Sequence, residues 1–100
     1  MNDLARFRLE IDGIDDQIVD LLARRFAICR KVAVFKLAHH IPVRLPERID
    51  QVKTRCADRA VASGVDRDFA VALYHQIIEE TCRAELVEQA ATAAAEDGPG

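Results

Sequence analysis

Residues 21–36, LLARRFAICRKVAVFK, combine an apolar helical stripe with two cations on one face. Arg25, Ile28 and Val32 follow one another at steps of three and four residues, which is the spacing of one side of an α-helix. Lys36 comes one turn after Val32. The stretch therefore predicts a helix that turns two long basic side chains toward its buried side.

The same period continues upstream, so we expect one uninterrupted amphipathic helix of about 36 residues, about 54 Å long. Asn2 or Asp3 can cap its start, and only Gly13 interrupts its pattern before the first proline, Pro42. The upstream apolar positions are Leu4, Phe7, Ile11, Ile14, Ile18 and Leu21.

Two shorter helices are predicted after the loop HHIPVRLP. The segment PERIDQVKTRCADRAVAS, residues 46–63, starts with a proline in its first turn and stops at Gly64. Asp66 then caps a third helix. Its expected inward stripe is Phe69, Leu73, Ile77, Ile78, Thr81, Glu85 and Leu86. We expect residues 1–90 to form one helical domain and residues 91–100 to be a disordered tail.

The fold class predicted is all-α, with one long, one short and one intermediate helix. A helix of about 54 Å would overhang any core that its neighbours could form, leaving much of its apolar stripe in water. Two such helices packed antiparallel about a twofold axis would cover each other. We therefore expect an intertwined homodimeric helical bundle.

The composition of the chain argues against several classes of function. The 100 residues carry a formal net charge of −3, which argues against a protein dedicated to binding nucleic acid. The acidic start of the chain and the lack of a long apolar block predict a cytoplasmic protein with neither signal peptide nor membrane span.

The three cysteines share no metal-binding spacing, and we expect reduced, partly buried thiols and no metal or other cofactor. His39 and His40 fall at a helix end, where they should meet free carbonyls.

Two interpretations of the inward cations remain open. Arg25 and Lys36 are three turns apart and rotated by only about 20° relative to each other, so they project from one face. Their stems could be buried while their heads reach water. Alternatively, they could line a polar pocket that binds a small anion. Arg8 lies about 25 Å before Arg25 along the axis, too far for one chain to use both, but an antiparallel partner could bring its Arg8 across.

Four segments in order resemble the all-helical, or AroQ-class, chorismate mutases over roughly residues 4–89. They are FRLEIDGIDDQIVDLLARR, VAVFK, IPVRLPER and GVDRDFAVALYHQIIEE. The resemblance implies a domain-entwined homodimer with two equivalent sites, each completed by an arginine from the other subunit. It assigns Arg8 as that arginine, Arg25 as a carboxylate ligand, Lys36 as the cation at the ether oxygen, and Arg48, Thr81 and Glu85 as further site residues.

The chemistry that the resemblance implies fits this set of residues. Chorismate is a dicarboxylate, and its Claisen rearrangement to prephenate is a concerted, unimolecular step that needs no nucleophile, metal or redox cofactor. Two arginines can hold the carboxylates with forked hydrogen bonds. Lys36 can stabilise the ether oxygen as negative charge develops there.

Three positions depart from the family pattern. Leu45 and Ile49 stand where chorismate mutases carry an acidic pair that contacts the ring hydroxyl of the substrate, and Glu85 replaces a neutral donor beside the ether oxygen. An ionised carboxylate there would repel the developing charge, so Glu85 must be protonated or serve another purpose.

These departures leave several functions open. Enzymes resembling isochorismate pyruvate lyase also lack the acidic pair. The strings RFAIC (25–29) and CRAE (82–85) are similar to those of the branch that acts on 4-amino-4-deoxychorismate, where Glu85 could pair with the substrate ammonium. We rank chorismate or its 4-amino analogue first and isochorismate second. A non-catalytic helical dimerisation module is the remaining alternative.

Overall fold

The computed structural model describes residues 2–96 as three α-helices. They are α1 (Asp3–Ala38), α2 (Pro46–Ala62) and α3 (Arg67–Glu96). No strand occurs among these residues, so the predicted all-α class is confirmed. None of the helices is long and apolar enough to cross a membrane within the part of the chain that is described.

Helix α1 has the 36 residues expected from its periodicity. Its first turn is capped by Asn2, whose side-chain oxygen accepts a hydrogen bond from the amide of Ala5 at 2.8 Å. At the other end, the ring Nδ1 of His39 lies 2.9 Å from the carbonyl oxygen of Phe35, as expected of a histidine at a helix C-terminus. His40 then adopts a left-handed φ of 56°, which turns the chain into the loop.

The connection between α2 and α3 is short and closed by polar contacts. Gly64 has a φ of +80°, the left-handed conformation that ends a helix at little steric cost. Asp66 caps α3 by accepting a hydrogen bond from the amide of Phe69 at 2.9 Å. Across the turn, Arg67 pairs with Asp58 at 2.8 Å. Pro46, Gly64 and Asp66 thus act as the sequence predicted.

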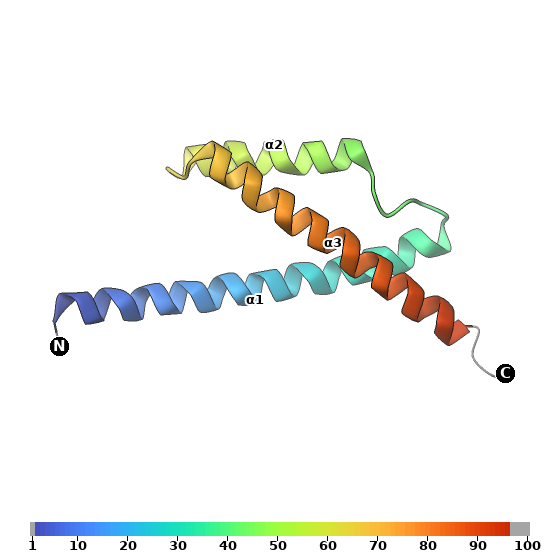
Figure 1. The fold of residues 1–100 in the computed structure, drawn as a ribbon, viewed down its shortest axis with the longest axis horizontal. Coiled ribbons are helices and arrows are strands. Elements are labelled where there is room, and N and C mark those ends of the chain that lie inside the picture. The colour runs from blue at the N-terminus through green and yellow to red at the C-terminus, as the bar shows by residue number, and fades with distance from the viewer. Residues whose placement is uncertain (1, 97–100) are drawn as a thin grey trace.

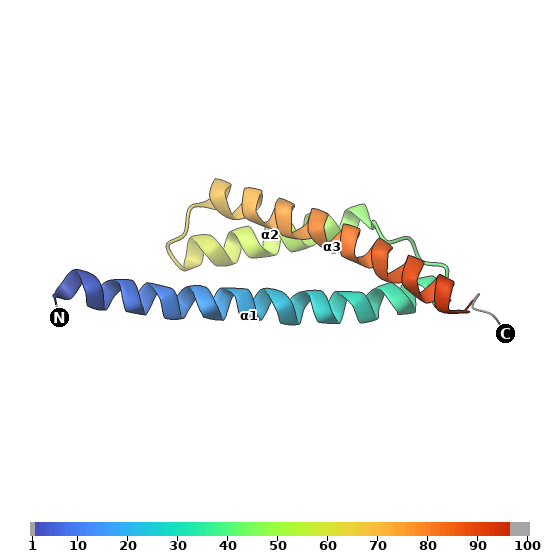
Figure 2. The same ribbon diagram turned by 60° about the horizontal axis from the view of Figure 1, so that its bottom comes forward.

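Helix α3 packs against both of the other helices, crossing α1 diagonally near the C-terminal end of α1 (Figures 1 and 2). At the crossing Ala33 is fully buried, because its small side chain lets the two helices approach closely. The core between α2 and α3 consists of Val52, Ile78 and Cys82. Half-buried residues pack against it: Val43, Ile49, Cys56 and Tyr74.

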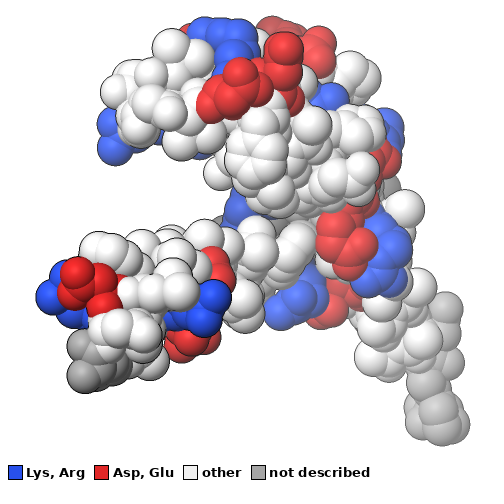
Figure 3. Space-filling model, turned by 60° about the vertical axis from the view of Figure 1, so that its left-hand side comes forward, with Lys and Arg blue, Asp and Glu red and all other residues white. Residues whose placement is uncertain are grey.

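The N-terminal half of α1 extends beyond this core and packs against neither α2 nor α3 (Figure 1). A hollow with mostly uncharged walls separates it from the α2–α3 pair (Figure 3). The radius of gyration is 17.9 Å, against about 13 Å for a compact domain of this length. The apolar side chains left exposed on this half are Leu4, Phe7, Leu9, Ile11, Ile14, Ile18 and Val19.

Two expectations about α3 were wrong in part. The helix continues to Glu96, so residues 91–96 are helical rather than disordered, because an alanine-rich run has high intrinsic helix propensity; residues 97–100 lie outside the described part. Phe69, Leu73 and Leu86 of the expected inward stripe are exposed in the single chain, since α3 is covered only where it crosses its neighbours. Ile78, Thr81 and Glu85 are buried as predicted.

Candidate active site

A pocket of about 370 Å³ lies where the three helices and the loop after α1 meet. This size falls in the range of small-molecule sites. Every residue singled out from the sequence lines it except Arg8: Arg25, Lys36, Leu45, Arg48, Ile49, Thr81 and Glu85. A larger hollow of about 1020 Å³ runs along α2, but it contains neither Arg25 nor Lys36. The smaller pocket is therefore the candidate site.

Lys36 is turned into the pocket and held there by two acceptors. Its Nζ donates to the backbone oxygen of Val43 at 2.8 Å and to Oε1 of Glu85 at 3.0 Å. The side chains of Lys36 and Glu85 are only 14% and 5% exposed, so each charge has its partner where water is scarce. An ammonium group has three N–H donors, and these partners use two, which leaves one for a bound oxygen.

Arg25 approaches the same space from one side of α1 and is held by α3. Its NH1 donates to Oγ1 of Thr81 at 2.6 Å, and the Thr81 hydroxyl donates in turn to the backbone oxygen of Ile77 at 2.8 Å. The hydroxyl thus acts as donor and acceptor at once. Arg25 and Lys36 therefore both line the same pocket, as a site for a small anion requires.

The wall contributed by the start of α2 and the residue before it is apolar apart from one cation. Leu45 and Ile49 are half-buried there, while Arg48 stands at the rim with NH1 donating to Oε1 of Gln51 at 2.7 Å. Glu85 is the only acidic residue among those lining the pocket, and it is paired with Lys36. The pocket thus offers cations and a hydroxyl against an apolar wall, a combination suited to a small, partly apolar anion.

Arg8 does not join this group. It is exposed on the N-terminal half of α1, about 25 Å along the helix from Arg25. A single chain therefore cannot bring Arg8 and Arg25 to one small ligand.

Several contacts of the pocket were not foreseen. The backbone oxygen of Val43 is a loop group with no side-chain signal. Cys29 and Cys82 line the pocket, whereas the sequence predicted only that they would be reduced, partly buried thiols. Outside the pocket, Gln89 donates from Nε2 to the backbone oxygen of Ala33 at 3.0 Å, beside the crossing of α1 and α3. Its position one turn after Glu85 was the signal that could have revealed it.

The cysteines of the described chain are all free thiols, as expected, with Cys82 buried. Burial raises the pKa of the Cys82 thiol, Glu85 and Glu79 add to the effect, and Arg44 and Lys36 partly offset it. No cluster of metal-ligating side chains occurs within residues 2–96.

The family model for chorismate mutase type II matches residues 7–93. The chain belongs to the type II chorismate mutase family. The match includes residues of all three helices, every residue that lines the pocket, and Arg8 on the exposed half of α1. It bears out the family that the sequence motifs indicated.

Curated relatives carry mutase names. The chain is 39% identical to a 4-amino-4-deoxychorismate mutase of Streptomyces venezuelae, over 96% of this chain and 94% of that protein. It is 37% identical to a protein of the same name from Streptomyces pristinaespiralis, over 82% of this chain and 64% of that protein. A chorismate mutase of Methanocaldococcus jannaschii is 32% identical, over 76% of this chain and 77% of that protein. The chain is thus an isomerase of the chorismate mutase type, and nothing in these relatives favours a lyase or a non-catalytic module.

Proposed function

We propose that this protein catalyses the Claisen rearrangement of 4-amino-4-deoxychorismate. The observation that carries the proposal is the pair of cations, Arg25 and Lys36, in one small pocket, which suits the carboxylates and the ether oxygen of a chorismate-like substrate. Two relatives, at 39% and 37% identity, bear the name of this mutase, which supports the choice of substrate.

In the proposed mechanism, the chain contributes positioning and charge. Arg25, oriented by Thr81, binds a carboxylate, and Arg48 adds positive charge at the rim. The remaining N–H of Lys36 donates to the ether oxygen, where negative charge grows as the carbon–oxygen bond breaks and the new carbon–carbon bond forms. The enclosed pocket holds the side chain of the substrate over the substrate's own ring. The entropy lost in reaching the reactive conformation is therefore lost on binding and not in the chemical step.

The proposal includes a homodimer. The N-terminal half of α1 carries an apolar face that its own chain leaves exposed, and the hollow beside it has mostly uncharged walls (Figure 3). A second α1, packed antiparallel, fits that space and covers both stripes. In this arrangement Arg8 of the partner subunit approaches the pocket that holds Arg25, completing the ligands for a dianion.

Chorismate is the second candidate substrate, because the chorismate mutase of Methanocaldococcus jannaschii is also a relative. Arg25 and Lys36 would serve its carboxylates and ether oxygen equally well. Leu45 and Ile49 accept a hydrogen bond neither from the hydroxyl of chorismate nor from the ammonium of its 4-amino analogue, so the order of the two substrates rests on the names of the relatives.

The test is to incubate the purified protein separately with 4-amino-4-deoxychorismate, chorismate and isochorismate, and to follow products by chromatography. We expect the highest kcat/KM for the 4-amino substrate and a loss of about a hundredfold or more in Lys36→Gln. A matched control is Lys31→Gln, since Lys31 lies exposed on the same helix outside the pocket. Turnover of isochorismate alone would overturn the proposal.

A further inference from the structure

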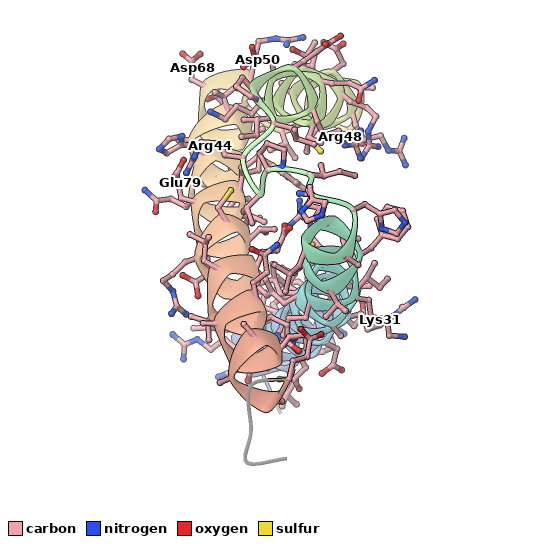
Figure 4. All side chains as sticks on the ribbon, turned by 90° about the vertical axis from the view of Figure 1, so that its right-hand side faces the viewer. Lys31, Arg44, Arg48, Asp50, Asp68 and Glu79 are labelled. Atoms are coloured by element: carbon pink, nitrogen blue, oxygen red, sulfur yellow. The ribbon has the colours of Figure 1, made fainter. Side chains whose placement is uncertain are left out.

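The loop between α1 and α2 is held from outside the pocket by one ion pair. Arg44 NH1 and NH2 donate to Oε1 and Oε2 of Glu79 at 2.9 and 2.8 Å, a two-point contact that fixes orientation as well as distance. Figure 4 shows Arg44 and Glu79 together on the side of α3 that faces away from α1. Neither residue lines the pocket.

The neighbours of Arg44 in the chain do line the pocket. Val43, just before it, supplies the backbone oxygen that accepts from Lys36 Nζ at 2.8 Å, and Leu45, just after it, forms part of the apolar wall. The loop also returns to α1, because the amide of Ile41 donates to the backbone oxygen of Lys36 at 2.9 Å. Moving Arg44 therefore moves a ligand of Lys36.

Both ends of this chain of contacts are anchored on α3. Glu79 holds Arg44 on the outer side, and Glu85 holds Lys36 on the inner side, with the Val43 carbonyl between them. Hydrogen bonds from Arg44 hold the pKa of Glu79 below its ordinary value of 4.5, so the pair is charged at neutral pH.

We infer that the Arg44–Glu79 pair is a positioning device for Lys36: it fixes the loop so that the Val43 carbonyl and Glu85 together aim the ammonium group at the bound ether oxygen. The inference rests on the proposed function for its effect on catalysis. An ordinary surface ion pair would add little to either stability or rate. The Arg44 and Glu79 side chains are 51% and 42% exposed, so their contribution lies in geometry rather than in burial.

The test compares Arg44→Gln with Arg67→Gln. The second variant breaks the Arg67–Asp58 pair, which has the same 2.8 Å contact and a similar exposure but braces the other inter-helix turn, away from the pocket. We expect Arg44→Gln to lower kcat about tenfold with KM within about threefold, because Lys36 acts mainly in the transition state. Arg67→Gln should retain kcat within about twofold, and both variants should melt within about 4 °C of the wild type.

Exchanging the two charges of the pair should restore kcat. A variant that had lost activity only because it was less stable would not be rescued in this way. The double variant Arg44→Glu with Glu79→Arg rebuilds the two-point contact in reverse and should recover most of the lost kcat. Glu79→Arg alone should be at least as impaired as Arg44→Gln, because two cations then face each other. Failure of the double variant to exceed the single ones counts against the inference.

A substrate-free measurement separates this inference from the proposed function. Lys36 and Lys31 are acetylated competitively in the full-length protein with trace acetic anhydride, and their labelling ratio is read by mass spectrometry. Lys31 is the reference because it is exposed on α1 and points away from the pocket (Figure 4). Arg44→Gln should raise the Lys36/Lys31 ratio several-fold.

An unchanged ratio, or an unchanged kcat, in Arg44→Gln overturns the inference. If the wild type turns over none of the three substrates, the proposed function fails, and the labelling ratio alone then decides whether the pair positions Lys36.

Discussion

Lys36 Nζ and Glu85 Oε1 lie 3.0 Å apart, so this cation of the pocket has a counter-charge from its own chain. This pair explains how a lysine that is only 14% exposed can be kept in a helical bundle. It also gives Glu85 a role, as the partner of Lys36, that could not be assigned from the sequence. The same carboxyl, however, stands beside the place where the proposed reaction develops negative charge.

Glu85→Gln tests whether the charge of this carboxyl supports or opposes catalysis. An ionised carboxylate repels the growing charge on the ether oxygen, whereas an amide is neutral and can donate to that oxygen. We expect Glu85→Gln to retain or raise kcat, because Gln removes the repulsion and still offers an acceptor to Lys36. The matched control is Glu80→Gln, an exposed carboxylate on the same helix, which should leave kcat unchanged. A large loss of kcat in Glu85→Gln alone would show that Lys36 needs the carboxylate charge.

Thr81→Val tests how Arg25 is oriented. The substitution keeps the volume but removes the oxygen that lies 2.6 Å from Arg25 NH1. We expect KM to rise about tenfold with little change in kcat, since a carboxylate ligand contributes to ground state and transition state alike. Thr81→Ser keeps the hydroxyl and should restore wild-type KM. Steady-state kinetics on the best substrate decide the matter, and equal KM values for the valine and serine variants would contradict this role.

The sequence predicted the parts of this molecule that depend on local rules. The period of α1 and its Asn2 cap predicted the long helix, and the three-turn spacing of Arg25 and Lys36 predicted their common face. The motifs then indicated the family. The rest depends on contacts that have no local signature, such as the Val43 backbone oxygen on Lys36.

The errors have a physical cause as well. Residues 91–96 were expected to be disordered because nothing in the sequence showed what they would pack against, yet their alanines favour a helix without packing. The Arg44–Glu79 pair joins a loop to a helix 35 positions later, and any exposed arginine looks like a solvated charge until the fold is known.

Cys82 offers a pH-dependent probe of the pocket. Burial raises the pKa of its thiol above the ordinary value of 9.0, so the reactive thiolate should form only at higher pH in the folded protein. In a Cys29→Ser, Cys56→Ser background, iodoacetamide should alkylate Cys82 with a midpoint above pH 9.0, and the same chain in urea should show a midpoint at or below it. A folded-state midpoint at or below that of the urea-treated chain would contradict the burial effect.

The same shift has a consequence for stability. The folded thiol binds its proton more tightly than the unfolded one, so its contribution to the free energy of unfolding is present below the unfolded pKa and is lost as pH rises through the folded pKa. Cys82→Ala should therefore remove part of the fall in melting temperature on the alkaline side of pH 9.0.

The exposed Arg8 and the pocket-lining Arg25 give the sharpest test of a shared site. A dimer of one Arg8→Ala subunit and one Arg25→Ala subunit has one pocket with both arginines intact and one with neither. Two inactive variants, unfolded together and refolded as an equal mixture, should therefore recover about a quarter of the wild-type activity, because half of the dimers are mixed and each has one working pocket. The control is a mixture of Arg25→Ala with Lys36→Ala, which must stay inactive because both residues line the pocket of their own chain and every pocket lacks one of them. If activity returns in the first mixture and not in the second, Arg8 belongs to the pocket of the neighbouring subunit. If neither mixture is active, each chain forms its site alone.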